Sequence, residues 1–317
     1  MEGARTADGV VLKQTVEEAG CLPWYARAKF GLVRGFLTGW MWCFGLTGLY
    51  RFGRFFGTCE WLINYKLRRR YRKRLAFIFG QDALSRSETR RLTRSWFVRQ
   101  RCDKLFYLVF DRIPKARILD RIDFIGREHI DEGLARGKGV YAAMSHVGTH
   151  HIVGVLMAIM GYKVAGVRDR KESALRLHMQ EVFAARYPEV AAIRIFFADE
   201  YPRDLFRCFK ENYVLGTALD VDRKRAPHLR RQKVRIFGQD REWLTGTLQI
   251  ALRCGATIFP GFWVSLPNYH FQLIAHEPLV DPETARDDPE IVAEAMQRYA
   301  DKVEAHVRAH PDHISKV

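Results

Sequence analysis

The hydrophobic pattern changes along the chain, and from residue 139 onward short apolar runs alternate with longer amphipathic segments. The runs have strand length and are rich in β-branched and aromatic residues, whereas the segments between them carry apolar residues at helical spacing. This alternation is typical of an α/β fold with a mostly parallel central sheet covered by helices on both faces. The predicted strands are 139–145, 163–167, 193–197, 213–219, 233–237, 257–264 and 270–275, and the predicted helices are 149–160, 171–186, 202–212, 243–254 and 288–309.

A different pattern occupies the N-terminal third of the chain. Residues 35–50, "GFLTGWMWCFGLTGLY", are uncharged and lie between Arg34 and Arg51. A spanning helix needs about 20 apolar residues, so this shorter run predicts a helix that lies in or dips into a membrane interface. Trp40 and Trp42 are of the residue type that settles at headgroup depth.

A basic cluster follows this apolar segment. Between Lys66 and Arg74, seven of nine residues are Lys or Arg. Such a cluster beside an aromatic apolar helix attracts an anionic leaflet, at roughly 1 kcal/mol per basic residue near the surface. The alternative is a buried core helix followed by a solvated helical face. The coincidence of the two elements favours an N-terminal helical membrane-associating region.

The domain organisation follows from these patterns. Residues 1–23 form a polar leader without the features of a secretory signal. Residues 24–74 hold the interfacial helix and basic cluster, and residues 75–317 form the α/β domain, as a single unit with the preceding region. Within that unit, an amphipathic helix is predicted to start at Ser85 or Ser87, with Glu88 in its first turn.

Composition narrows the set of partners. The 317 residues carry a formal charge of +16, which favours anionic partners. Nucleic acid is not predicted, because the chain has no helix-turn-helix pattern, zinc-ligand spacing or aromatic ribonucleoprotein motif. The six cysteines lack regular spacing, which indicates free thiols in a reducing, cytoplasmic compartment.

The candidate chemistry gathers in "AAMSHVGTHHIVG", which holds His146, His150 and His151. His146 directly follows the predicted strand 139–145, and in open α/β sheets ligands bind beyond the carboxyl ends of strands. Asp220 with Asp222 follows the strand 213–219, and Arg168 follows the strand 163–167. If these strands are neighbours, the three groups of polar side chains meet at the carboxyl edge of the sheet.

Three interpretations of the histidines compete. A metal site is disfavoured because no further ligands occur at a recognisable spacing, so neither a metal nor a cofactor is predicted. A tight strand-to-helix turn without chemistry is the second interpretation. The third is general base catalysis, in which a neutral imidazole takes a proton from an attacking hydroxyl while a second group orients the ring.

Six segments of the chain follow one another in a recognisable order: "RRYRKRLAFIFG", "LSRSETRRLTRSWF", "GKGVYAAMSHVGTHHIVGVLMAIMGYKVAGVRD", "NYVLGTALDVDRK", "VRIFGQDREWLTGTLQIALRCGATIFPGFW" and "YADKVEAHVRAHPDHI". Their order resembles the lipid A late acyltransferases, the lauroyl and myristoyl transferase branch of the lysophospholipid acyltransferase superfamily. The resemblance covers residues 24–314. It implies transfer of a fatty acyl group from a carrier thioester, acyl carrier protein or coenzyme A, to a hydroxyl of a glycolipid or lipid at the cytoplasmic face of the inner membrane. The alternatives are a non-catalytic lipid-binding relative and a transferase of another carrier-bound group such as an aminoacyl.

The family signature is a histidine, four residues, and then Asp or Glu. The resemblance implies that His146 is the general base, and the acidic position falls on His151. A carboxylate would stabilise the imidazolium, whereas a histidine orients the base only as a neutral acceptor. Three outcomes are open: Asp220 or Asp222 takes over, the neutral pair works at reduced rate, or the chemistry is lost or changed.

The resemblance also implies a set of supporting residues. Arg168, Arg194 and Asp220 fall where the family places polar site residues, so substrate contacts or site organisation are expected of them; for Arg194 the alternative is a surface ion pair. The amides near Gly148 are expected to donate to the oxyanion. Phe237 and Gly238 are expected to shape the pocket wall, although a plain hairpin would have the same sequence.

Overall fold

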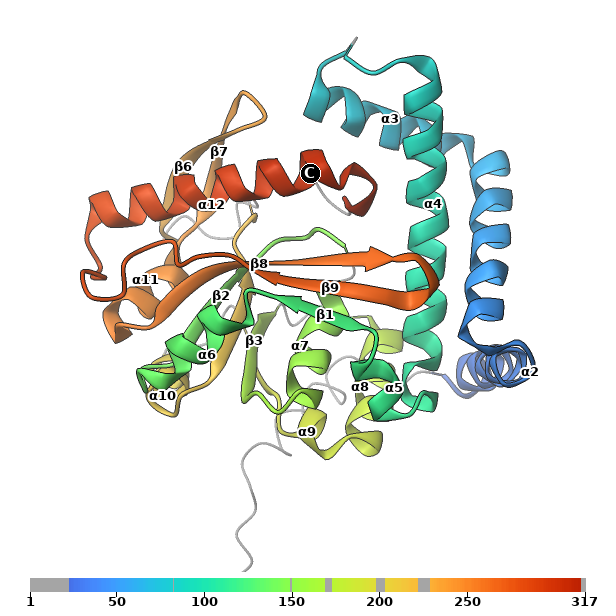
Figure 1. The fold of residues 1–317 in the computed structure, drawn as a ribbon, viewed down its shortest axis with the longest axis horizontal. Coiled ribbons are helices and arrows are strands. Elements are labelled where there is room, and N and C mark those ends of the chain that lie inside the picture. The colour runs from blue at the N-terminus through green and yellow to red at the C-terminus, as the bar shows by residue number, and fades with distance from the viewer. Residues whose placement is uncertain are drawn as a thin grey trace, which may run out of the picture.

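The computed structural model describes residues 23–81, 83–148, 150–168, 173–197, 203–221 and 229–314, without the side chains of His150 and His151. The predicted polar leader, apart from its last residue, and Asp222 therefore lie outside the described residues. Within them, a central sheet carries helices on both faces and a long helical region stands at one side (Figure 1).

The central sheet has seven strands in the order β1-β9-β8-β2-β5-β3-β4. All neighbouring pairs are parallel except β8 and β9, which form an antiparallel pair. The mostly parallel sheet is confirmed, and β1 is an additional strand that the hydrophobic pattern did not indicate. The strands are β1 (Ile122–Ile125), β2 (Val140–Met144), β3 (Val164–Arg168), β4 (Arg194–Phe197), β5 (Val214–Ala218), β8 (Thr257–Leu266) and β9 (His270–Ala275).

Alternating side chains of β2 enter two separate cores. Val140 and Ala142 face one core with α6, α7 and α8, whereas Tyr141 and Ala143 face another with α10, α11 and α12. This two-sided burial explains why β2 is apolar throughout rather than alternating. The covering helices are α6 (Arg127–Ala135), α7 (His150–Ile159), α8 (Ala174–Arg186), α9 (Pro188–Ala191), α10 (Arg203–Lys210), α11 (Gly246–Cys254) and α12 (Pro289–Ala309).

The predicted strand 233–237 does not belong to the central sheet. It is part of β6 (Arg231–Ile236), which pairs with β7 (Gln239–Leu244) in a separate antiparallel hairpin. Phe237 and Gly238 form its two-residue turn with φ of 51° and 72°. Positive φ at both central residues belongs to the type I′ turn, whose twist matches that of a hairpin. The hydrophobic pattern did not predict this hairpin, because β7, "QDREWL", is mostly polar.

The N-terminal region consists of α2 (Trp24–Ile63), α3 (Tyr65–Phe79) and α4 (Arg86–Val109). The predicted apolar helix is bent within its length, because Gly45 has a non-helical φ of 67° inside α2. The predicted start of α4 is confirmed at Ser85, which forms a capping box with Glu88. In the part of the chain that the structure describes, no helix combines the length and apolarity needed to cross a membrane.

Packing ties α4 to both α2 and the sheet. Gly57 of α2 sits so close to the backbone of Val98 that a Cβ there would lie 2.5 Å from its Cα. On the other side, Phe106 stacks on Tyr269 at 5.0 Å between ring centroids. The helix α2 thus lies on the outer side of α4, at the edge of the molecule (Figure 1). Short connecting helices complete the chain: η1 (Phe110–Arg112), α5 (Lys115–Leu119), η2 (Pro267–Tyr269) and η3 (Pro311–His313).

Candidate functional site

The strand register brings His146 and Asp220 together. In the parallel pair β2 and β5, Met144 is aligned with Ala218. His146 and Asp220 each lie two residues beyond these aligned positions, so both leave the sheet at the same point of its carboxyl edge. The sequence predicted this meeting on the condition that the two strands are neighbours, and the sheet order meets that condition.

Asp220 contacts His146 through both carboxylate oxygens. Oδ2 accepts a hydrogen bond from the His146 backbone N–H at 2.7 Å, and Oδ1 lies 2.7 Å from the ring Nδ1. Because a carboxylate only accepts, the Nδ1 proton is donated to it, and Nε2 becomes the ring nitrogen with an acceptor lone pair. The side chains are 20% and 12% exposed, so this is a largely desolvated pair with one orientation of the imidazole.

Two further hydrogen bonds hold the strand ends in place. The Met144 carbonyl accepts from the Leu219 backbone N–H at 3.0 Å and from the Tyr299 hydroxyl at 2.6 Å. Burial, and next the charge of Asp220, raise the pKa of Tyr299 well above its usual value, so its hydroxyl remains a donor. Tyr299 was missed in the sequence because it occupies an ordinary apolar-face position of α12.

The turn after His146 requires a glycine at position 148. Its φ is 66°, and a Cβ there would lie 2.8 Å from the Trp263 carbonyl oxygen, so the turn requires glycine. Its N–H donates to the His313 carbonyl at 2.6 Å. That amide is therefore already engaged, and an oxyanion contact from the neighbouring amides stays a prediction.

The side chain that holds His146 differs from the one implied by the family signature. The side chain of His151 lies outside the described residues, as do those of His150 and Asp222. Of the carboxylates considered as replacements, Asp220 makes the contact with Nδ1. The role of His151 stays a prediction.

The two candidate arginines lie at different places. Arg168 ends β3 at the same edge of the sheet as His146; its Nη1 donates to Gln180 at 2.7 Å, and its guanidinium lies over the Phe197 ring. Arg194 instead begins β4, three residues before the carboxyl end of that strand, or about 10 Å along it.

Arg194 makes the ion pair that was the alternative to a site role. Its Nη1 lies 2.6 Å from Glu211 Oε2, and its guanidinium stacks over Tyr213, 4.3 Å from the ring centroid. Glu211 and Tyr213 precede β5, at the edge of the sheet away from His146. The structure thus places Arg194 in an ion pair at the other end of its strand from His146, and its contact with substrate stays a prediction.

Phe237 and Gly238 lie at the tip of the hairpin of β6 and β7. The Phe237 N–H donates to Glu304 of α12 at 2.5 Å, and its ring contacts Phe77 of α3 at 5.7 Å. These contacts dock the hairpin on α3 and α12. Phe237 and Gly238 thus form a hairpin turn, and their part in a pocket wall stays a prediction.

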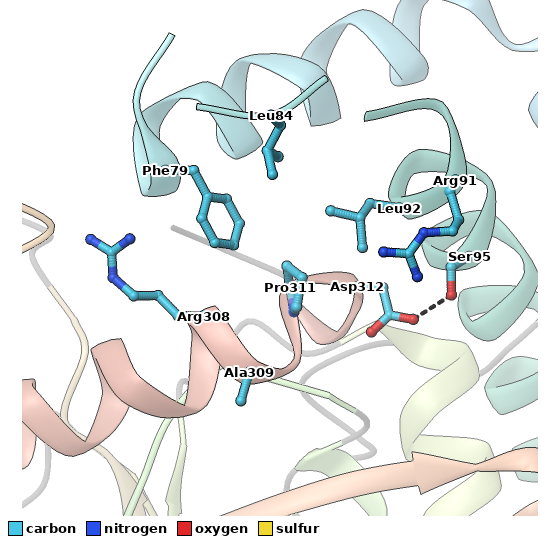
Figure 2. A pocket seen from close by; sticks show the side chains of 9 residues that line it. All are labelled: Phe79, Leu84, Arg91, Leu92, Ser95, Arg308, Ala309, Pro311 and Asp312. Atoms are coloured by element: carbon cyan, nitrogen blue, oxygen red, sulfur yellow. Dashed lines mark hydrogen bonds between the residues drawn. The ribbon is translucent and has the colours of Figure 1, made fainter. Parts of the chain in front are cut away.

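Metal-ligating side chains do not gather in the described part of the chain: no group of three or more His, Cys, Asp or Glu could hold an ion there. The rings of His306, His310 and His313 lie in a row, but at 4.9 and 5.4 Å between successive centroids they pack as aromatic rings. A cavity of about 400 Å³ lies beside this row, between α3, α4 and the end of α12, and neither His146 nor Asp220 lines it (Figure 2).

One known protein family matches most of the chain. The model of the bacterial lipid A biosynthesis acyltransferase family matches residues 27–313. The chain belongs to this family. A comparison with curated proteins gave no match. As a lipid A biosynthesis acyltransferase by family, the chain is assigned acyl transfer as its general activity, with an acyl donor and a lipid acceptor as substrates. The family match spans α3, α4, the sheet with its His146 and Asp220 edge, and most of α2.

Proposed function

We propose that this chain is a membrane-associated O-acyltransferase that moves a fatty acyl group from a carrier thioester to a hydroxyl of a glycolipid or lipid. The observation that carries the proposal is the bond between His146 Nδ1 and Asp220, within a chain of an acyltransferase family. A carboxylate on Nδ1 presets the tautomer that a general base needs and stabilises the imidazolium that forms. The donor is acyl carrier protein or coenzyme A, since the net charge of +16 suits either anionic carrier.

In the proposed reaction, His146 Nε2 takes the proton of the acceptor hydroxyl as its oxygen attacks the thioester carbonyl carbon. The C–O bond forms and the carbonyl becomes a tetrahedral oxyanion. When this intermediate collapses, the C–S bond breaks and the His146 imidazolium returns the proton to the leaving thiolate. Asp220 is a positioning residue, because it acts through the imidazole. Arg168, at the same edge of the sheet, is proposed to contact substrate.

The membrane surface is proposed to be the outer side of α2 and the start of α3. Among the described residues, every exposed large hydrophobic side chain except Ile125 and Leu175 lies between Trp24 and Tyr65. Trp42 and Leu32 are each 77% exposed to solvent. An apolar surface of this kind marks an interaction site, and the adjoining basic cluster of α3 favours an anionic leaflet. The cytoplasmic leaflet of the inner membrane is the anionic surface that the carrier thioester reaches.

Serine substitution of Leu32, Trp42 and Phe44 together is expected to weaken binding to anionic phospholipid vesicles at least about tenfold, because apolar area no longer leaves water on binding. Cosedimentation with vesicles measures this. The matched control is Ile125→Ser with Leu175→Ser, which removes exposed apolar side chains elsewhere and should leave binding unchanged. Equal binding by the two multiple variants would contradict the proposed surface.

The proposed activity is tested by lipid mass spectrometry of cells with and without the gene. Loss of the gene should remove lipid species heavier by one ester-linked acyl chain, and the gene carrying His146→Ala should not restore them. Identical lipid profiles, together with retained vesicle binding, would instead indicate a lipid-binding relative without chemistry. A lost species whose added mass contains nitrogen would indicate transfer of an aminoacyl group.

A further inference from the structure

The C-terminal turn, residues 311–314, contacts the turn that carries His146. The His313 carbonyl accepts the Gly148 N–H at 2.6 Å, and Ile314 forms an antiparallel bridge with Val147. The His313 ring adds a contact to the sheet, because its Nε2 accepts the Ser265 N–H of β8 at 2.9 Å. One residue thus links β8 to the backbone two positions after His146.

The opposite side of this turn is held by the N-terminal helices. The Tyr71 hydroxyl of α3 donates to the Pro311 carbonyl at 2.7 Å, and Trp96 Nε1 of α4 donates to the Ile314 carbonyl at 2.8 Å. Asp312 pairs with Arg99 of α4 at 3.0 Å and accepts from the Ser95 hydroxyl (Figure 2). The turn therefore connects α3 and α4 to the candidate site.

The protonation of His313 fits this connection. Its side chain is buried, and burial is the largest cause that lowers its pKa, to about 4, so the ring is neutral at pH 7. Because Nε2 accepts from Ser265, the proton lies on Nδ1, which donates to Asp312 Oδ1 at 3.1 Å. The position requires one acceptor and one donor on the same side chain, which an imidazole supplies and an aliphatic side chain cannot.

We propose that His313 is a positioning residue for the reaction: it fixes the turn 146–148, and through it the place of the His146 imidazole, relative to α3, α4 and β8. This inference rests on the proposed function for its catalytic consequence. Asp220 sets the rotation of the ring, whereas His313 sets where the backbone that carries the ring lies. A displacement of about 1 Å of a catalytic group can cost about 10²-fold in rate, so this second anchor matters for turnover.

The test compares His313→Leu with His313→Gln. Leucine removes both polar contacts, while the glutamine amide again offers an acceptor and a donor. With leucine we expect kcat for acyl transfer to fall at least about tenfold, with the KM for the thioester changed less than about twofold. Hydrogen exchange of the Gly148 amide should speed up at least about tenfold, since its partner is no longer held. Glutamine should bring both quantities to within about threefold of the parent protein.

Tyr187→Phe is the matched control for general destabilisation. Tyr187 is likewise buried and donates to the carbonyls of Phe110 and Ile113, away from the turn. It should lower thermal stability without changing kcat or Gly148 exchange. If His313→Leu does not fold, the milder Asp312→Asn is measured in the same way and should show a smaller change in the same direction.

Three outcomes would overturn the inference: unchanged Gly148 exchange in the leucine variant, faster exchange with unchanged kcat, or no recovery with glutamine. Hydrogen exchange does not depend on turnover. If the parent protein transfers no acyl group, the proposed function fails, while exchange at Gly148 still decides whether His313 holds the turn.

Discussion

Replacing His146 with alanine is expected to lower kcat for acyl transfer by about 10²–10⁴-fold, the range over which a positioned general base acts. The physical reason is that the hydroxyl of the acceptor is a weak nucleophile until its proton is taken. The loss should fall on kcat, with the KM for the acyl thioester little changed, because the imidazole acts in the transition state rather than in holding the donor. Single-turnover transfer to a radiolabelled acceptor by the purified, membrane-reconstituted protein measures it.

The control for this substitution is His129→Ala. His129 lies on α6, away from the carboxyl edge of the sheet, and its loss should leave kcat unchanged. Both variants should keep the thermal unfolding midpoint and vesicle binding of the parent protein. Activity within about threefold of the parent in the His146 variant would rule out the general base and leave proximity alone to explain transfer.

The sequence predicted the part of the site that follows from strand ends. His146 and Asp220 come after apolar runs that are both read as buried strands, and parallel neighbours must present their carboxyl ends at one edge. Hydrophobic periodicity placed both residues at strand ends, and the strand order of the sheet brings them together although they lie 74 positions apart. Arg194 was expected at the site from the family resemblance alone, and it begins its strand, at the other end from His146.

Other contacts of the fold could not be predicted from the local hydrophobic pattern. The hydrogen bond from Gly148 to His313 joins a strand-to-helix turn to the last described turn of the chain. No residue spacing within either segment predicts this bond. The hairpin of β6 and β7 packs on α12 through Trp243, whose ring contacts Tyr299, and the Arg235 N–H donates to Gln297 at 2.9 Å. Its second strand, β7, is mostly polar and has no apolar run that would predict it.

Hydrogen bonds and an ion pair connect the N-terminal helices to the candidate site. Tyr71, Trp96 and Arg99 on α3 and α4 hold the C-terminal turn, and that turn holds Gly148. Helix α2, whose other side carries the exposed apolar side chains, packs on the same α4. The N-terminal region is therefore built into the support of the His146 turn rather than attached to the α/β domain as a separate anchor.

Asp220→Asn is expected to lower kcat by about 10²–10⁴-fold, close to the effect of removing His146 itself. Asparagine keeps the size of the side chain and one oxygen for the His146 backbone N–H. Its amide group, however, donates to Nδ1 and so favours the tautomer with the proton on Nε2, which can no longer accept one. The matched control is Asp123→Asn on β1, where the carboxylate accepts only from Gln272 among the described residues.

Combining His151→Glu with Asp220→Asn tests the role of residue 151. Because Asp220 already occupies Nδ1 of His146, His151→Glu alone should change kcat less than about threefold. In the Asp220→Asn variant, the added carboxylate at the family's acidic position should recover about tenfold or more of the lost rate, since it offers Nδ1 a new acceptor. The non-additivity of the two changes, read from a double-mutant cycle on kcat, measures how far Asp220 has replaced the family's acidic residue. Full activity of Asp220→Asn, or a large gain from His151→Glu alone, would show that Asp220 is not the carboxylate that orients His146.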